Sequence, residues 1–207
     1  MNSIYGKKIG MTRIFTEAGD SVGVTVIEVE PLTVIRLKTT AKDGYNAAVV
    51  SFGKIRPTLA NKPFKGQFDK TGTELKRKLK ELPIEVADKL EKGSKIGVDI
   101  FKPGEMVHVS GVSRGLGFQG AVRRHHFSGG PKTHGQSDRL RAPGSVGASS
   151  YPSRTFKGQR MAGHMGDEKV TVKNIKVVAI EVEQNLLLVN GPVPGHRNSI
   201  VYVRKAR

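Results

Sequence analysis

The sequence predicts a mainly β protein, because short runs rich in Val and Ile recur along it and are separated by turn-prone residues. Such runs lie both before position 112 and after position 166, and they flank a long segment without a core-forming pattern. No apolar run reaches the length of about 18 residues that indicates a membrane-spanning helix. At 207 residues, the chain suits one substantial core with a large excursion.

The first fifty residues predict four strands. Glu17 to Asp20 and Lys42 to Gly44 are turn signals, and Pro31 ends the second run, because proline cannot donate a ladder hydrogen bond. Short strands joined by tight turns are typical of an antiparallel meander or barrel. The four predicted strands cover residues 9–15, 22–29, 34–39 and 47–52.

An insertion at about 54–93 interrupts this pattern. Its first part, 54–72, is rich in Pro, Lys and Gly and is predicted to be irregular, with Phe64 and Phe68 as isolated anchors. From Glu74 to Glu91, leucines three and four residues apart predict short amphipathic helices that break near Pro83. We interpret the cations on the first of these helices as its solvated face: Lys76, Arg77, Lys78 and Lys80.

Strand patterns return on both sides of the segment 112–166. The sequence therefore predicts a β body made of residues 1–111 and 167–207, with 112–166 leaving and re-entering it through neighbouring strands as a long extended loop. The further predicted strands cover 96–100, 106–109, 170–172, 177–182, 186–189 and 200–203.

Positive charge is concentrated in this segment. The chain has a formal net charge of +17, and the segment holds nine Lys and Arg against the single acid Asp138. A glycine-rich stretch that repels itself and offers few aliphatic side chains needs an acidic partner to order it, and polyphosphate fits. The candidate RNA-binding cations are Arg114, Arg123, Arg124, Lys132, Arg139, Arg141, Arg154, Lys157 and Arg160, and on the β body Lys7, Lys8 and Arg13.

Histidines are also concentrated there. His125, His126 and His134 suit hydrogen bonding or stacking on exposed bases and sugars. Because arginines flank them and no cysteine or carboxylate cluster accompanies them, we expect no metal site. The chain has no cysteine, which excludes disulfides and thiolate chemistry and fits a cytosolic protein.

Two enzymatic interpretations are less favoured. Gly115, Gly117 and Gly120 spell G-x-G-x-x-G, but arginines, histidines and helix-breaking residues follow where a dinucleotide fold needs an apolar helix. No serine lies in a G-x-S-x-G turn. We therefore expect no catalytic residue and no cofactor. A phosphate- or nucleotide-handling enzyme and a nucleoid-type DNA-binding protein remain the rival hypotheses.

The run GGPKTHGQSDRLRAPGSVGASSYPSRTFKGQRMAGHMG, from Gly129 to Gly166, closely resembles the signature loop of the bacterial large-subunit ribosomal protein L3 family. Three further matches extend the resemblance over essentially the whole chain in order: GKKIGMTRIF at 6–15, VTVIEVEP at 24–31 and NLLLVNGPVPG at 185–195.

The resemblance implies a six-stranded translation-protein barrel whose long loop enters the large-subunit RNA and approaches the peptidyl transferase centre. It also implies a non-enzymatic, early-binding assembly protein of the cytoplasmic large ribosomal subunit. The implied partners are large-subunit ribosomal RNA and neighbouring ribosomal proteins, with no membrane and no small-molecule substrate. Some bacterial relatives carry a methylated glutamine in the loop tip, which this sequence lacks. The matching tip is Gly147, Ala148, Ser149, Ser150, Tyr151 and Pro152.

Overall fold

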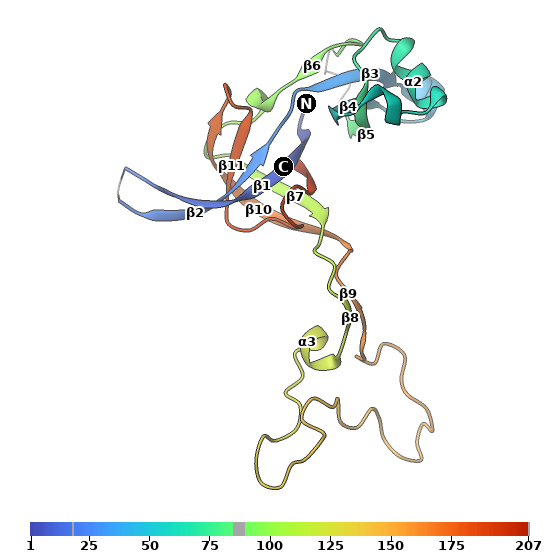
Figure 1. Cartoon of the computed structure of the whole chain (residues 1–207), viewed down its shortest axis with the longest axis vertical. Helices are drawn as coiled ribbons and strands as arrows, with labels where there is room; N and C mark the ends of the chain where they lie inside the picture. The colour runs from blue at the N-terminus through green and yellow to red at the C-terminus, as the bar shows by residue number, and fades with distance from the viewer. Residues whose placement is uncertain (18, 85–89, 207) are drawn as a thin grey trace. The chain divides into compact units, whose positions relative to one another are not determined.

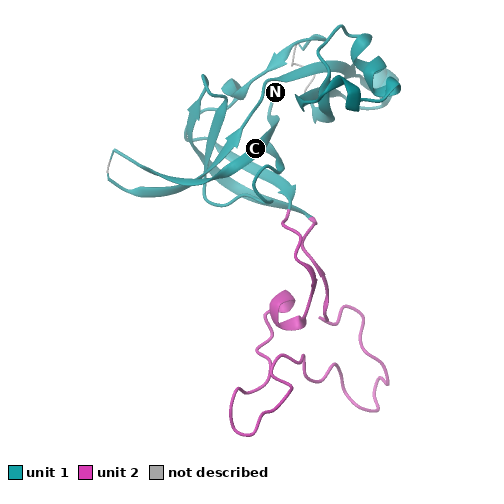
Figure 2. Cartoon of the chain, viewed as in Figure 1, with its two compact units in different colours: residues 1–112, 169–207 teal, residues 113–168 magenta. Residues whose placement is uncertain are grey.

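The computed structural model describes residues 1–17, 19–84 and 90–206 of the chain. These residues form two compact units, each with its own internal contacts (Figure 2). Unit 1 comprises Met1–Val112 and Lys169–Arg207, and unit 2 comprises Ser113–Glu168. No helix among the described residues is long and apolar enough to cross a membrane.

Unit 1 contains a closed antiparallel barrel of six strands (Figure 1). The strands pair in the order β1-β12-β7-β10-β11-β2, so the mainly β fold and the six-stranded barrel that were expected are confirmed. Alternate residues of each strand point inward, and the valines and isoleucines of the predicted runs fill the interior. The strands are β1 Ser3–Phe15, β2 Ser21–Glu28, β7 Met106–Val112, β10 Lys169–Glu181, β11 Leu186–Asn190 and β12 Ile200–Lys205.

A second, four-stranded sheet packs on the same core. Its strands lie in the order β5-β4-β3-β6 and comprise β3 Leu32–Lys38, β4 Ala47–Lys54, β5 Lys76–Pro83 and β6 Lys95–Ile96. The four strands predicted in the first fifty residues are therefore divided between two sheets. The division falls at Pro31, between β2 and β3. Buried Leu32, Val50 and Leu82 from this sheet join the barrel interior in one apolar cluster.

The predicted helix over the first part of 74–91 is wrong. Residues 76–83 form the edge strand β5, which pairs with β4 from Ala47↔Pro83 to Lys54↔Lys76. Backbone N–H and C=O groups along the edge of β4 hydrogen-bond to this segment. This tertiary pairing outweighs the weak helical tendency indicated by three leucines spaced three and four residues apart. The second half of the predicted helical segment, 85–89, lies outside the described residues, as does Ala18 in the first predicted turn.

Two smaller predictions also need correction. The segment 54–72, which was expected to be irregular, contains a 3₁₀ turn at Pro57–Leu59 and the helix α2 at Lys62–Asp69. In α2 the rings of Phe64 and buried Phe68 pack at a tilt of 57°, with centroids 5.3 Å apart. The expected strand 96–100 is a strand only at Lys95–Ile96, and Val98–Ile100 is a 3₁₀ turn. Such a turn brings positions three apart to one face, which buries both Val98 and Phe101.

The remaining turns follow local chemistry. The Lys42 to Gly44 signal becomes the one-turn helix α1, Thr40–Asp43, which ends at Gly44 with a positive φ of 81°. The strands at the two ends of the basic segment are neighbours, because β7 pairs with β10 and Val112 lies opposite Lys169.

Candidate nucleic-acid interface

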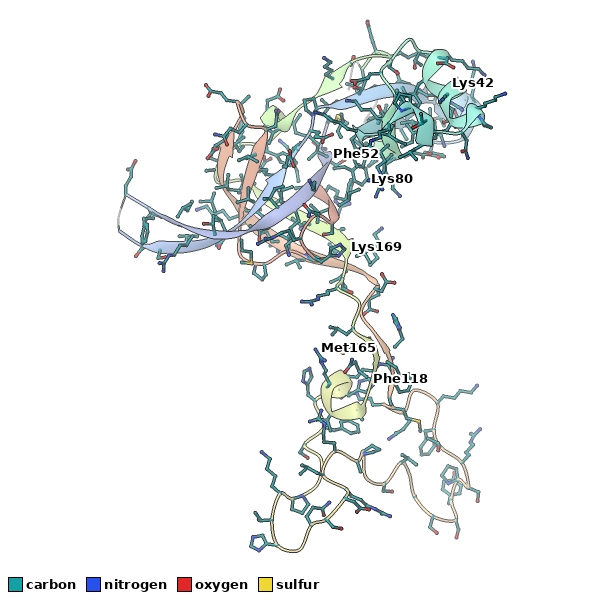
Figure 3. The ribbon with its side chains drawn as sticks, viewed as in Figure 1. Lys42, Phe52, Lys80, Phe118, Met165 and Lys169 are labelled. Carbon is teal, nitrogen blue, oxygen red and sulfur yellow. The ribbon has the colours of Figure 1, made fainter. Side chains whose placement is uncertain are left out.

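Unit 2 begins with a paired neck, which we define as residues 113–119 and 163–168. The backbone N–H of Ser113 donates to the Glu168 carbonyl at 2.9 Å, and the N–H of Leu116 donates to the Met165 carbonyl at 2.9 Å. Strands β8, Gly117–Gln119, and β9, Gly163–Met165, continue the pairing, with Phe118 opposite His164 (Figure 3). These bonds give the two arms of the segment a common base.

A short helix follows the neck and is attached to the returning arm. Helix α3, Ala121–His125, ends at His126, whose φ of 60° is left-handed. Arg124 Nη1 donates to the Met161 carbonyl at 2.9 Å, and the His125 ring nitrogen Nε2 lies 3.1 Å from the same oxygen. Two predicted RNA-binding residues therefore also have contacts inside the unit, and both are half-buried.

A closed sub-loop, residues 129–142, comes next. The Gly130 N–H donates to the Leu140 carbonyl at 2.9 Å. The Gln136 side-chain oxygen accepts from the N–H groups of Arg139 at 2.9 Å and Leu140 at 3.2 Å. A Cβ at Gly130 would lie 2.8 Å from the Arg139 carbonyl oxygen, so only glycine allows this approach. The bonds hold the backbone, while the side chains of Lys132, His134, Arg139 and Arg141 stay exposed.

The stretch from 143 to 160 has no helix or strand and is held by short-range turns. Ser145 Oγ donates to the Gly147 carbonyl at 2.9 Å, and Ser153 Oγ donates to the Ser150 carbonyl. The predicted tip residues 147–152 lie here, and all but Pro152 are exposed. Hydroxyls that bond to their own backbone are structural, and no serine here has a base beside it.

The cations of unit 2 are available to a partner. Unit 2 is described in full, and none of its nine Lys and Arg makes a salt bridge within it. All of them are exposed except half-buried Arg124. Only Ala121 is fully buried in the whole unit. Unit 2 has only Asp138, Asp167 and Glu168 as acids, none of them in a salt bridge with its cations, and it has no core, so a polyanion fits its surface.

Exposed aromatic rings accompany these cations, and sequence reasoning did not single them out. Phe118, Tyr151 and Phe156 are 77%, 85% and 60% exposed. Every base has a π face, and exposed rings in a cationic segment are the usual stacking platforms of single-stranded RNA. The available signal was weak, because of the rings in this segment only Phe156 is directly followed by a cation, Lys157.

The predicted contacts on unit 1 differ in availability. Lys7 is exposed and lies 3.7 Å from Glu28, and exposed Arg13 has its guanidinium 6.0 Å from the Phe15 ring centroid. Lys8 donates from Nζ to the carbonyls of Val193 at 2.8 Å and Gly195 at 3.0 Å. Burial lowers the pKa of its ammonium. Lys8 thus has a role within the barrel, where it holds the loop before β12.

Of the G-x-G-x-x-G glycines, Gly115 and Gly117 lie in the neck and Gly120 precedes helix α3. A three-residue strand and the five-residue helix α3 surround them, whereas a dinucleotide site needs a long apolar helix on a parallel sheet. Across the described residues, no group of three or more His, Asp or Glu lies close enough together to hold a metal ion.

Sequence reasoning missed a second group of cations in unit 1. The 27 residues from Lys54 to Lys80 hold nine Lys and Arg against Asp69 and Glu74. This density was visible in the sequence, but the helical interpretation of 74–82 assigned four of the nine to a solvated face. In the structure they line an edge strand.

A β-barrel body joined to a unit with exposed, unpaired cations, exposed rings and a single buried residue is typical of nucleic-acid-binding proteins that contact phosphates and stack on bases. A family model described as ribosomal protein L3 matches residues 2–182. The chain belongs to this family, as its signature segment indicated.

Curated relatives agree over full length. The chain is 52% identical over 204 residues to the large ribosomal subunit protein uL3 of Chloroherpeton thalassium, with 98% of each protein covered. It is 48% identical over 206 residues to uL3 of Herpetosiphon aurantiacus, with 100% of this chain and 97% of the relative covered. It is also 48% identical over 204 residues to uL3 of Chlorobium limicola, with 98% of each covered.

Proposed function

We propose that this chain is a structural, non-enzymatic constituent of the large ribosomal subunit that binds large-subunit ribosomal RNA through unit 2. The family and its relatives named as large ribosomal subunit proteins support the coarse role. The observation that carries RNA binding is the set of nine unpaired cations on a unit with a single buried residue. It is located in the cytoplasm, as bacterial large ribosomal subunits are.

The mechanism is charge neutralisation and bracing. Arginines and lysines of unit 2 contact phosphates, which gives affinity and position, while backbone shape and stacked rings give the fit. The tip at 147–152 supplies no catalytic group and braces RNA near the peptidyl transferase centre. Ordering RNA around a long cationic segment also suits early subunit assembly beside neighbouring ribosomal proteins.

Salt dependence of binding to ribosomal RNA tests the proposal. If about six phosphates are neutralised, log K falls against log salt with a slope of roughly −4 to −5. Replacing Arg139, Arg141 and Arg154 with alanine removes up to three of these contacts and is expected to reduce the slope by about 2 to 3. The measurement is filter binding to large-subunit RNA at several salt concentrations.

A triple alanine variant of exposed Lys42, Lys102 and Lys173 in unit 1 is the matched control. It removes the same net charge and is expected to leave the slope within about 1 of the parent. Equal losses in the two triple variants would show that net charge alone drives binding and would contradict a role for unit 2. Sedimentation of cell extract checks the coarse role, since the chain is expected to travel with large subunits.

A further inference from the structure

Unit 1 carries its own cationic surface, distinct from unit 2. The nine cations between Lys54 and Lys80 lie on β4, the turn after it, helix α2 and the edge strand β5. Among the salt bridges of the described residues, only Lys76 of this set has a partner, Glu74 at 3.0 Å. An edge strand rich in lysine resists pairing with another sheet, so this surface is suited to an anion rather than to an added strand.

Several of these cations line a cleft between the barrel and the second sheet. The cleft has a volume of about 520 Å³, within the range of small-ligand sites. Its sheet wall carries Lys54, Arg77 and Lys78. Lys54 and Arg77 also line an adjoining groove with Arg56. A ligand that leaves the cleft along this wall therefore meets a further cation.

The opposite wall has a different chemistry. It comes from β1, the end of β2 and the turn before β12, and it presents Glu28, Glu30 and Asn198 together with Lys7, which lies 3.7 Å from Glu28. The Glu30 carboxylate accepts from the Gly53 N–H at 3.0 Å through Oε2, so its other oxygen remains an acceptor without a hydrogen bond in the described residues. Glu30 and Asn198 on this wall can accept hydrogen bonds, while Lys7 offsets the charge of Glu28.

Between the two walls lie aromatic rings. Tyr5 and Phe52 stack with centroids 5.5 Å apart and planes inclined by 13°, and Tyr202 follows Tyr5 at 5.1 Å. Phe52 is almost fully buried and Tyr5 is half-buried, and both line the cleft. The cleft thus combines a cationic end, an acceptor end and an aromatic floor.

We propose that this cleft binds one nucleotide of single-stranded RNA. The phosphate lies on the wall of Lys54, Arg77 and Lys78, and the base lies against the aromatic floor. Ribose hydroxyl and base N–H donors face Glu28, Glu30 and Asn198. An acidic peptide offers no aromatic base for the rings and few donors for Glu30 and Asn198, whereas a nucleotide has an anionic end and a donor-rich base. This inference rests on the proposed RNA partner, but not on unit 2.

The first experiment uses the full-length chain with a fluorescent single-stranded RNA octamer. Replacing Arg77 and Lys78 with glutamate is expected to weaken binding about tenfold or more and to reduce the salt slope by about 0.7, for the one phosphate that the cleft holds. The matched control replaces Lys62 and Lys65 of helix α2 with glutamate, which makes the same charge change outside the cleft. Its expected loss is less than about threefold. Melting temperatures show whether both variants fold. Replacing Arg77 and Lys78 with alanine repeats the test without introducing carboxylates.

The second experiment locates the base. An octamer containing 5-iodouridine is photo-crosslinked to the full-length parent and the products are mapped by mass spectrometry. Cross-links are expected at Tyr5 in addition to unit 2, and they are expected to disappear in the Arg77→Glu, Lys78→Glu variant. Cross-links confined to 113–168, or equal losses of affinity in the cleft and control variants, would overturn the proposal. So would displacement of the Tyr5 cross-link by polyglutamate at the concentration at which unlabelled RNA displaces it.

These outcomes are separable from a failure of the proposed function. Loss of affinity on replacing Arg139, Arg141 and Arg154 reports on unit 2, and loss on replacing Arg77 and Lys78 reports on the cleft. If RNA affinity is unchanged in the cleft variant but falls in the unit 2 variant, only the inference about the cleft is rejected. If RNA affinity falls in the cleft variant but is unchanged in the unit 2 variant, the proposed binding of RNA through unit 2 is rejected.

Discussion

Single residues of unit 2 divide into those that hold its backbone and those that face outward. Gly166 belongs to the first group, because its φ is 79° and a Cβ there would overlap the Arg114 carbonyl oxygen and approach its carbon to 3.0 Å. Arg124 also belongs to it through the Met161 carbonyl. Arg123 belongs to the second, since it is exposed and has only a long contact of 3.5 Å with Gln119.

Gly166→Ala is expected to open the neck. Both the strained backbone and the overlap with Arg114 cost energy, together roughly 1–3 kcal/mol of local stability. Hydrogen exchange of the amides of residues 113–119 and 163–168 is expected to speed up accordingly. Gly147→Ala is the control, because no atom lies within 4 Å of a Cβ there and its φ is not left-handed. Similar exchange in the two variants would contradict a structural role for Gly166.

Arg123→Ala and Arg124→Ala remove the same charge from neighbouring positions. Both are expected to reduce the salt slope of RNA binding by up to about 1. Only Arg124→Ala is expected to speed amide exchange at 161–165, because it alone removes a hydrogen bond to the returning arm. Exchange mapped residue by residue by NMR makes the comparison. If Arg123→Ala increased amide exchange at 161–165 equally, the hydrogen bond of Arg124 would not be what holds the returning arm.

At the scale of elements, the second sheet is fastened across its central strand by polar side chains. Lys38 on β3 and Glu81 on β5 are 2.8 Å apart, and Tyr45 donates from its hydroxyl to Glu81 Oε2 at 2.7 Å. Hydrogen bonds from Lys38 and then Tyr45 lower the pKa of the Glu81 carboxyl, and the bond to Glu81 raises the pKa of Lys38. Glu81 and Tyr45 are exposed and only Lys38 is half-buried, so the stabilisation is small.

Glu81→Gln is therefore expected to lower the urea midpoint slightly at pH 7. Because the folded pKa of Glu81 lies below its unfolded value of about 4.3, its contribution is present above that value and is lost as pH falls through the folded pKa. The difference between variant and parent is expected to shrink toward pH 3. The control Glu183→Gln changes an exposed carboxylate without a salt bridge in the described residues and is expected to show no such trend. A difference that persisted undiminished at pH 3 would exclude the ionised pair as its cause.

At the scale of the whole molecule, the apolar core and the coreless cationic segment belong to different units. The apolar cluster of barrel and second sheet lies entirely in unit 1, and unit 2 buries only Ala121. A change in the order of unit 2 is therefore expected to leave the core of unit 1 intact, because few apolar contacts are made by unit 2.

Replacing residues 127–155 with a short Gly-Ser linker is expected to leave unit 1 folded. The neck and α3 remain, and no buried residue is removed. The melting temperature is expected to fall by no more than a few degrees, since a shorter loop costs less closure entropy. Reconstituted subunits with this variant are expected to assemble poorly or to form peptide bonds slowly. A cooperative collapse of the barrel on calorimetry would show that the segment contributes to the core after all.

Several features of this protein follow from its sequence alone. The valine and isoleucine runs determined the barrel strands, because their period of two buries one face whichever neighbours they meet. The nine cations against one acid in 112–166 predicted a segment that builds no core. The signature from Gly129 to Gly166 identified the family, which was then confirmed.

Only the tertiary structure decided the rest. Lys76–Pro83 became a strand because β4 offered it a hydrogen-bonding ladder, a partner some thirty residues away that a local leucine spacing does not register. Pro31 divided four consecutive strands between two sheets. Lys8, Arg124 and His125 proved to hold carbonyls of distant residues, and Arg77 and Lys78 came to line a cleft opposite Glu28 and Glu30. Composition reports how many charges a segment carries, but which atoms they face depends on strand pairing that brings together residues distant in sequence.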